Sequence, residues 1–154
     1  MKALLILISF IFLSASNLMH EDTLLKIDKD GNIIGLPEEY SPAIFDLDKK
    51  YLRINDKEIV FPDCLNYYFN DHEKPELNLS ASWYHPKDIM PYYLNFNISQ
   101  KDVNYGYNIL VDLESLELIY IRKWIKEGNT IHNPKIEIEE KCLEEYKKGI
   151  KIKE

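Results

Sequence analysis

The side chains best suited to catalysis or metal binding in this chain are four histidines, His20, His72, His85 and His132, and they are scattered. None has the paired spacing of a helical metal site or lies beside a pair of cysteines. The chain also lacks a nucleophile elbow, a phosphate-binding loop, a dinucleotide fingerprint and a zinc signature. His72 stands between Asp71 and Glu73, a setting that a solvated loop explains better than a metal site. The sequence therefore assigns no catalytic residue, no metal ligand and no cofactor.

One loop keeps an enzymatic alternative open. His85, with Asp88 or Tyr84, lies next to aromatic residues, and a catalytic set can be dispersed along a chain. This cluster fits a small hydrolase or a sugar-binding protein. The aromatic residues that we expect at this end of the predicted sheet are Trp83, Tyr84, Tyr92, Tyr93, Tyr105 and Tyr107. Trp83, Tyr92 and Tyr107 fall on the apolar side of the predicted strands, so packing in the core explains them better than ligand binding.

A second set of polar residues follows the period of two that is typical of β-strands. Between 77 and 84, and again between 92 and 99, apolar residues alternate with uncharged polar ones. Tyrosine supplies rigid amphipathic contact area, and serine and asparagine supply adaptable hydrogen bonds, as in antibody paratopes. The hypothesis is a flat recognition face for a protein or a glycan, formed by Ser80, Ser82, Tyr84, Tyr93, Asn95 and Asn97 together with Asn78. An ordinary solvent-facing sheet surface explains the pattern equally well.

Two glycosylation sequons fall on the same face. Asn78-Leu79-Ser80 and Asn97-Ile98-Ser99 both match the acceptor pattern. In a eukaryotic source, attached sugar would cover this surface and prevent it from binding a protein. The sequence does not state the source.

The elements that must position these residues form a predicted antiparallel meander over 77–125. Shared parity places Trp83 opposite Tyr92, Ala81 opposite Leu94 and Leu79 opposite Phe96. A shift of one residue would turn the apolar set towards water, so this register is strongly favoured. The polar pairs that follow from it are Ser82 with Tyr93, Ser80 with Asn95, and Asn78 with Asn97.

The second half of the meander is predicted from strands at 105–113 and 116–125. One face of this pair carries Tyr105, Tyr107, Ile109, Val111 and Leu113, matched by Leu116, Leu118, Tyr120 and Trp124, with Arg122 as the exception. The reverse face is also partly apolar, at Leu110, Ile119, Ile121 and Ile125. Strands that are buried on both faces have this composition. We therefore expect a helix to cover Leu110, Ile119 and Ile121.

The remaining elements complete an α+β prediction. A hairpin with Gly31 in its turn joins 23–28 to 32–36, and three short strands follow at 43–47, 51–55 and 58–61. A short helix is expected near 63–70, from the spacing of Leu65, Tyr68 and Phe69. A C-terminal helix is expected near 139–148, with acidic residues early and lysines late, and it is the candidate cover for the sheet. An edge strand at Ile136 and Ile138 is the alternative for the segment before it.

The N-terminal segment has the pattern of an export signal. A lysine, an apolar run over 3–13 and Ser14-Ala15-Ser16 have the order of a secretory signal peptide, and the run is short for a bilayer span. We expect residues 1–16 to be removed and residues 17–154 to form a single secreted or periplasmic domain without stable membrane insertion. In such a chain the two cysteines, Cys64 and Cys142, predict one disulfide, with two buried free thiols as the alternative.

The net charge of the chain limits the classes of partner that it can bind. The net charge of −7 argues against nucleic acid and anionic lipid, which bind through lysine and arginine. It is compatible with a basic protein partner, although many soluble proteins are simply acidic. The first hypothesis is thus an exported, non-catalytic binding module of the inhibitor or immunity kind, which binds another protein. The alternatives are the hydrolase or carbohydrate-binding protein near His85 and a structural component of an envelope or surface.

Overall fold

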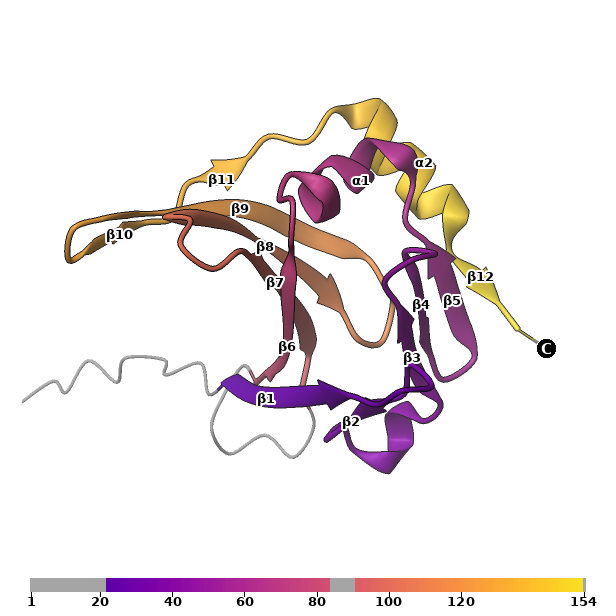
Figure 1. The fold of residues 1–154 in the computed structure, drawn as a ribbon. Coiled ribbons are helices and arrows are strands. Elements are labelled where there is room, and N and C mark those ends of the chain that lie inside the picture. Colours follow the sequence, from indigo (N-terminus) through magenta and orange to yellow (C-terminus); the bar gives the residue numbers. More distant parts are fainter. Residues whose placement is uncertain (1–21, 84–90, 154) are drawn as a thin grey trace, which may run out of the picture.

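The computed structural model describes residues 22–83 and 91–153, and the predicted meander lies at its centre (Figure 1). The register of the first pair is confirmed, since Leu79 pairs with Phe96, Ala81 with Leu94 and Ser80 with Asn95. The predicted α+β class with a twisted, mainly antiparallel sheet is also confirmed. The meander strands are β6 (Glu76–Ser82), β7 (Tyr93–Ser99), β8 (Tyr105–Asp112) and β9 (Leu118–Glu127).

Four shorter strands extend the meander into an eight-stranded sheet. Its order is β10-β9-β8-β7-β6-β1-β2, and β11 also pairs with β9. The predicted N-terminal hairpin is present as β1 (Asp22–Ile27) and β2 (Ile33–Ile34), with Gly31 at a φ of +86° in its turn. At the other edge lie β10 (Thr130–His132) and β11 (Lys135–Ile136).

A second, four-stranded sheet has the order β12-β5-β4-β3. Three of its strands match the short strands expected from the sequence: β3 (Ala43–Asp46), β4 (Tyr51–Ile54) and β5 (Lys57–Val60). The fourth, β12 (Lys151–Ile152), returns from the C-terminus to pair with β5 and was not predicted. A 3-10 turn (Glu38–Tyr40) precedes β3.

The two predicted helices are present within one residue of their expected limits, as α1 (Asp63–Asn70) and α2 (Glu140–Gly149). They lie together on one side of the large sheet, next to the four-stranded sheet (Figure 1). The helix α2 packs on β5 and donates a hydrogen bond from the Tyr146 hydroxyl to the Leu116 carbonyl oxygen. Of the three residues that it was expected to cover, only Ile121 shares the core cluster with Cys142 and Tyr146 of α2. The expectation is wrong for Leu110, which lies outside that cluster, and for Ile119, which is 40% exposed. Neither helix in the described ranges is long and apolar enough to cross a bilayer.

Aromatic rings from both sheets and both helices meet in the core. The rings of Phe45 and Phe96 are 5.0 Å apart, those of Phe61 and Phe96 5.7 Å apart, and those of Phe61 and Tyr146 5.7 Å apart. Phe69 of α1 lies 5.4 Å from Phe61. All five side chains are almost fully buried. The core face of the large sheet is therefore held by contacts that join every layer of the protein.

The parity predicted for β9 is wrong, because the pairing of β8 with β9 contains an irregularity. Leu110 pairs with Tyr120, whereas the next residue, Val111, pairs with Leu118, so Ile119 is an extra residue. A bulge of this kind reverses which residues face the core on one side of it. Ile121 consequently pairs with Ile109 in the core, and Arg122 and Trp124 lie on the opposite face.

Candidate functional site

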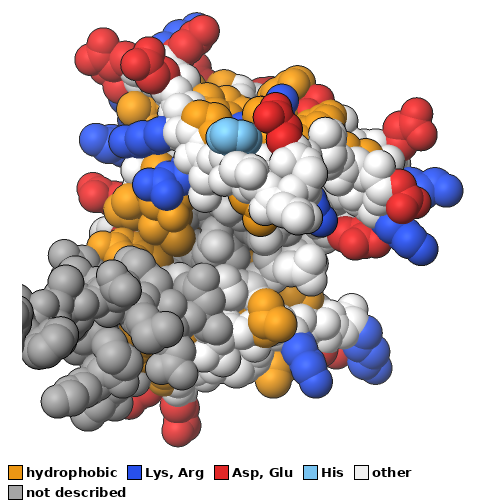
Figure 2. Space-filling model, turned by 90° about the vertical axis from the view of Figure 1, so that its left-hand side faces the viewer, with side chains coloured by type: hydrophobic (Ala, Val, Ile, Leu, Met, Phe, Trp, Pro, Cys, Tyr) orange, Lys and Arg blue, Asp and Glu red, His pale blue; other side chains and the backbone are white. Residues whose placement is uncertain are grey.

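The face of the large sheet turned away from the aromatic core carries rows in which uncharged polar side chains predominate. We call it the polar face. Because antiparallel partners share a face, the pairings define its rows: Asn78, Asn97, Asn108 and Arg122 form one, and Leu24, Ser80, Asn95, Leu110 and Tyr120 form the next. Viewed from the left of Figure 1, the molecule has a hollow lined by uncharged polar side chains and backbone, and charged side chains stand on the projecting parts around it (Figure 2).

Several polar atoms on this face have no hydrogen-bond partner within the described protein. They comprise two acceptors, Oδ1 of Asn95 and of Asn108, and two donors, Nε of Arg122 and Nε1 of Trp124. All four atoms are buried and come from the neighbouring strands β7, β8 and β9. Buried polar groups in native proteins are nearly always paired, so a cluster without partners calls for an explanation. A ligand that both donates and accepts hydrogen bonds would supply one.

Aromatic side chains and the arginine complete the β9 side of the polar face. The Arg122 guanidinium carbon lies 4.4 Å from the centre of the Tyr120 ring. The Trp124 indole packs against Gly106, its partner on β8. A Cβ atom at position 106 would lie 2.6 Å from the indole ring and 2.4 Å from the Ile98 carbonyl oxygen. The glycine thus allows the indole to lie close over the sheet.

The structure brings together most of the residues predicted for the binding face and changes their relative accessibility. Tyr93, Asn95 and Asn97 are partly exposed along β7, whereas Ser80 and Ser82 are only 8% and 5% exposed. Tyr84 lies outside the described residues. The accessible part of the face is therefore shifted from β6 towards β8 and β9.

Sequence reasoning missed Asn108, Tyr120, Arg122 and Trp124 as members of this face. Tyr120 and Trp124 had been assigned to the core by an uninterrupted alternation from Leu116, and Arg122 stood out as an exception to it. The bulge at Ile119 removes the exception, because Arg122 lies on the polar face with both aromatic residues. A charged residue in an otherwise apolar row was thus the sequence signal for the change of parity.

The proposed aromatic end near His85 is wrong in one respect. Because β7 and β8 are antiparallel, Ile98 pairs with Tyr107 and Tyr93 pairs with Asp112. Tyr105 and Tyr107 therefore lie at the opposite end of the sheet from Tyr92 and Tyr93. His85 and Asp88 fall outside the described residues.

Two histidines, His72 and His132, lie in the described segments. His72 is 6% exposed, and its ring centre lies 4.9 Å from that of Tyr105. His132 is exposed, 3.5 Å from Glu127. The described residues contain no group of three or more His, Cys, Asp or Glu side chains that could hold a metal ion.

Asp71, which follows α1, bonds to tyrosine hydroxyl groups and so links the end of this helix to the core face of the large sheet. The Tyr107 hydroxyl donates a 2.6 Å hydrogen bond to Asp71. Burial favours the neutral form of Asp71, but hydrogen bonds from Tyr107, Tyr67 and Tyr105 outweigh it and lower the pKa of this carboxyl below its ordinary value. Burial, followed by the bond to Asp71, raises the pKa of Tyr107. These groups are paired with one another, so this network is structural.

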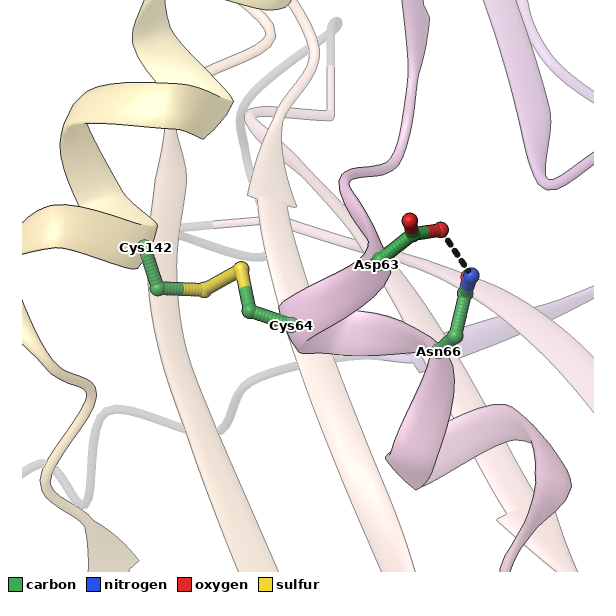
Figure 3. Close-up of a disulfide and its surroundings, with 4 residues drawn as sticks. All are labelled: Asp63, Cys64, Asn66 and Cys142. Carbon is green, nitrogen blue, oxygen red and sulfur yellow. Dashed lines mark hydrogen bonds between the residues drawn. A yellow bond between two sulfur atoms is a disulfide. The ribbon is translucent and has the colours of Figure 1, made fainter.

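Cys64 and Cys142 form a disulfide that joins the first turns of α1 and α2 (Figure 3). Beside it, the Asn66 side chain donates a 2.8 Å hydrogen bond to the Asp63 carboxylate within α1. The two cysteines lie 78 residues apart in the chain, and their Cα atoms lie 5.9 Å apart. The disulfide fixes the helices to each other on the core side of the sheet, away from the polar face.

Comparison of the chain with protein-family models, curated proteins and solved structures finds no match.

Proposed function

We propose that this protein is an exported, non-catalytic binding module that recognises another protein through the polar face. The observation that carries the proposal is the cluster of unpaired polar atoms on Asn95, Asn108, Arg122 and Trp124. A sheet surface that only faced water would leave its amide and guanidinium groups hydrated, without burying them unpaired.

The composition of the face suits a protein partner. Asparagine amides both donate and accept hydrogen bonds, as do the peptide groups of a partner. Tyrosine, tryptophan and arginine are the residue types enriched where binding energy concentrates. Arg122, stacked on Tyr120, and Trp124, packed on Gly106, are held by contacts within the sheet. Such preorganisation reduces the entropy lost when a partner binds.

A glycan ligand is the second candidate, and one observation favours it. Sugar hydroxyl groups donate and accept hydrogen bonds, which would satisfy acceptors and donors that lie close together, and Trp124 and Tyr120 are partly exposed beside them. The extent of the polar face over β7, β8 and β9 favours the larger contact area of a protein, which a stable interface needs.

The test is affinity capture by the mature protein from the secreted and envelope fractions of its native source. The double variant Asn97→Ala/Arg122→Ala removes side chains from one row of the polar face. Arg53→Ala on β4, in the smaller sheet, is the matched control. We expect the wild type and the control to retain one stoichiometric partner and the double variant to lose it.

Two outcomes would count against the proposal. A partner that the double variant retains at wild-type yield would place the binding surface elsewhere. If the same capture yields no protein, while a panel of oligosaccharides binds and Trp124→Ala abolishes that binding, the glycan candidate replaces the protein one.

A further inference from the structure

A second recognition feature lies where the β7–β8 end of the large sheet meets the smaller one. It is a cavity of about 380 Å³, whose walls include Tyr40, Tyr92 and Leu113. Four carboxylates from three separate segments also line it: Glu39, Asp56, Asp112 and Glu114. We call it the acidic pocket. It adjoins the polar face, because Asp112 pairs with Tyr93.

The carboxylates of the acidic pocket have no cationic partner among the described residues. None of them takes part in an ion pair. Among the described lining residues Lys57 is the only lysine, and its ammonium group donates a hydrogen bond to the backbone carbonyl oxygen of Glu114. Asp112 accepts hydrogen bonds from the amides of Glu114 and Ser115, which hold the turn and leave its negative charge in place. The pocket therefore retains an excess of negative charge.

The hydroxyl of Tyr40 lies within this negative field. It donates a 2.7 Å hydrogen bond to the Pro91 carbonyl oxygen. Burial raises the pKa of Tyr40, and the charges of Glu114 and Asp112 raise it further. Two carboxylates near the end of β8 thus act on a tyrosine that is distant from them in the sequence.

A larger cavity, of about 750 Å³, lies between the turns at 28–31 and 46–49, and two lysines, Lys29 and Lys49, line it together with its aspartates. Asp28 accepts hydrogen bonds from the Asp30 and Asn32 amides. Asp46 accepts two turn amides and lies 3.0 Å from the Lys49 ammonium. Asp28, Asp46 and Asp112 all stabilise turns, but Asp46 is also paired with a lysine. That ion pair distinguishes the larger cavity from the acidic pocket, whose described carboxylates form none.

We propose that the acidic pocket binds the guanidinium group of an arginine side chain on the partner protein. A guanidinium is planar, so it can stack on a tyrosine ring while it donates hydrogen bonds to carboxylates at its edge. The pocket has room for one such side chain, and the net charge of −7 favours a basic partner surface. The inference rests on the proposed function in one respect, that the ligand belongs to a protein.

The experiment uses the mature protein and the peptide acetyl-Gly-Arg-Gly-amide at low ionic strength, followed by two-dimensional amide NMR. We expect saturable shifts at Tyr40, Tyr92 and Leu113. The matching citrulline peptide, which has the same shape without the charge, should bind at least tenfold more weakly. The matching lysine peptide should also bind more weakly, since an ammonium group lacks the planar shape that lets a guanidinium lie on a ring and donate paired hydrogen bonds to carboxylates at its edge. Binding of all three peptides with equal affinity would overturn the proposal.

Variants locate the site. Asp56→Asn/Glu114→Gln removes two exposed carboxylates and should weaken arginine-peptide binding at least fivefold. Glu117→Gln makes the same kind of change in the same β8–β9 connection, outside the pocket, and should leave binding unchanged. Equal loss in both would show general charge attraction and overturn the proposal. Unchanged thermal melting of all variants would establish that the loss is not unfolding.

The peptide experiment is independent of partner capture. Arginine-specific binding without any captured partner would retain the pocket and reject the proposed function. Capture of a partner through the polar face without arginine-peptide binding would support the proposed function and reject the arginine site in the acidic pocket.

Discussion

The two faces of the large sheet are built from alternate residues of the same strands and are completed in opposite ways. On the core face, Phe96 packs against rings from β3, α1 and the residue that follows β5, and the Tyr107 hydroxyl is bonded to Asp71. On the polar face, Asn95, which precedes Phe96, and Asn108, on the adjacent strand β8, each have a buried Oδ1 atom without a hydrogen-bond partner in the described protein. One parity of β7 thus packs into the core, and the other forms the face that we propose for recognition.

The substitution expected to change the stability of the protein most is Phe96→Ala, on the core face. Phe96 is fully buried against three aromatic side chains, so its loss should destabilise the protein by about 3–5 kcal/mol. Asn97→Ala, one residue away on the other face, should change stability by no more than about 0.5 kcal/mol. Urea denaturation followed by circular dichroism measures both, and similar losses would contradict the division between the faces.

The next effect concerns the disulfide on the core side. Cys64→Ser/Cys142→Ser opens a 78-residue loop and should lower the free energy of unfolding by about 2–4 kcal/mol, chiefly because the unfolded chain gains freedom. The same denaturation experiment measures it. Partner capture at low temperature should persist in this variant, because the disulfide lies away from the polar face. Lost capture by a folded variant would show that the faces are coupled.

A smaller effect is expected from Tyr107→Phe. This change removes the hydroxyl that bonds to Asp71, and should cost about 1.5 kcal/mol at pH 7, near the low end for a bond to a charged group. The folded-state pKa of Asp71 is lowered, so its ionised form stabilises the fold above its unfolded value of about 3.9, and this contribution is lost as the pH falls. The stability gap between variant and wild type should therefore narrow between pH 5 and about pH 2. A gap that is constant with pH would contradict this account of Asp71.

The smallest effect on stability should come from Asn108→Ala. Its Oδ1 atom is buried without a partner, so removing it should change stability by less than about 0.5 kcal/mol. Binding of the partner should nevertheless weaken. Calorimetric melting and capture yield, measured on the same sample, separate the two effects. A loss of several kcal/mol would show that Asn108 is structural.

The sequence allowed the β6–β7 register to be predicted because apolar and polar residues alternate there without interruption, so a slip would expose a whole apolar row. The β8–β9 pair could not be predicted in the same way. Both of its faces carry apolar residues, and the shift at Ile119 exchanges one face for the other at little cost in burial. The β9 residues of the polar face, Tyr120, Arg122 and Trp124, were missed for that reason.

The placement of elements that are distant in the chain also escaped prediction. The helical pattern predicts where α2 begins and ends, but it does not predict which elements α2 contacts. The position of α2 depends on the disulfide and on β5. Strand β12 has two residues, too few to show any period. The acidic pocket combines the segment around Glu39 and Tyr40 with the β4–β5 turn and the β8–β9 connection, and no local pattern indicates that these meet.

The disulfide determines how the protein would respond to force applied at its two ends. Tension would run through Cys64 and Cys142 and bypass residues 65–141, which contain all four strands of the meander. At about 3.5 Å per residue, on the order of 270 Å of chain is withheld from extension. Under mechanical load the outer segments would unravel first, and the sheet that carries the polar face would remain folded as a closed loop until the bridge was reduced.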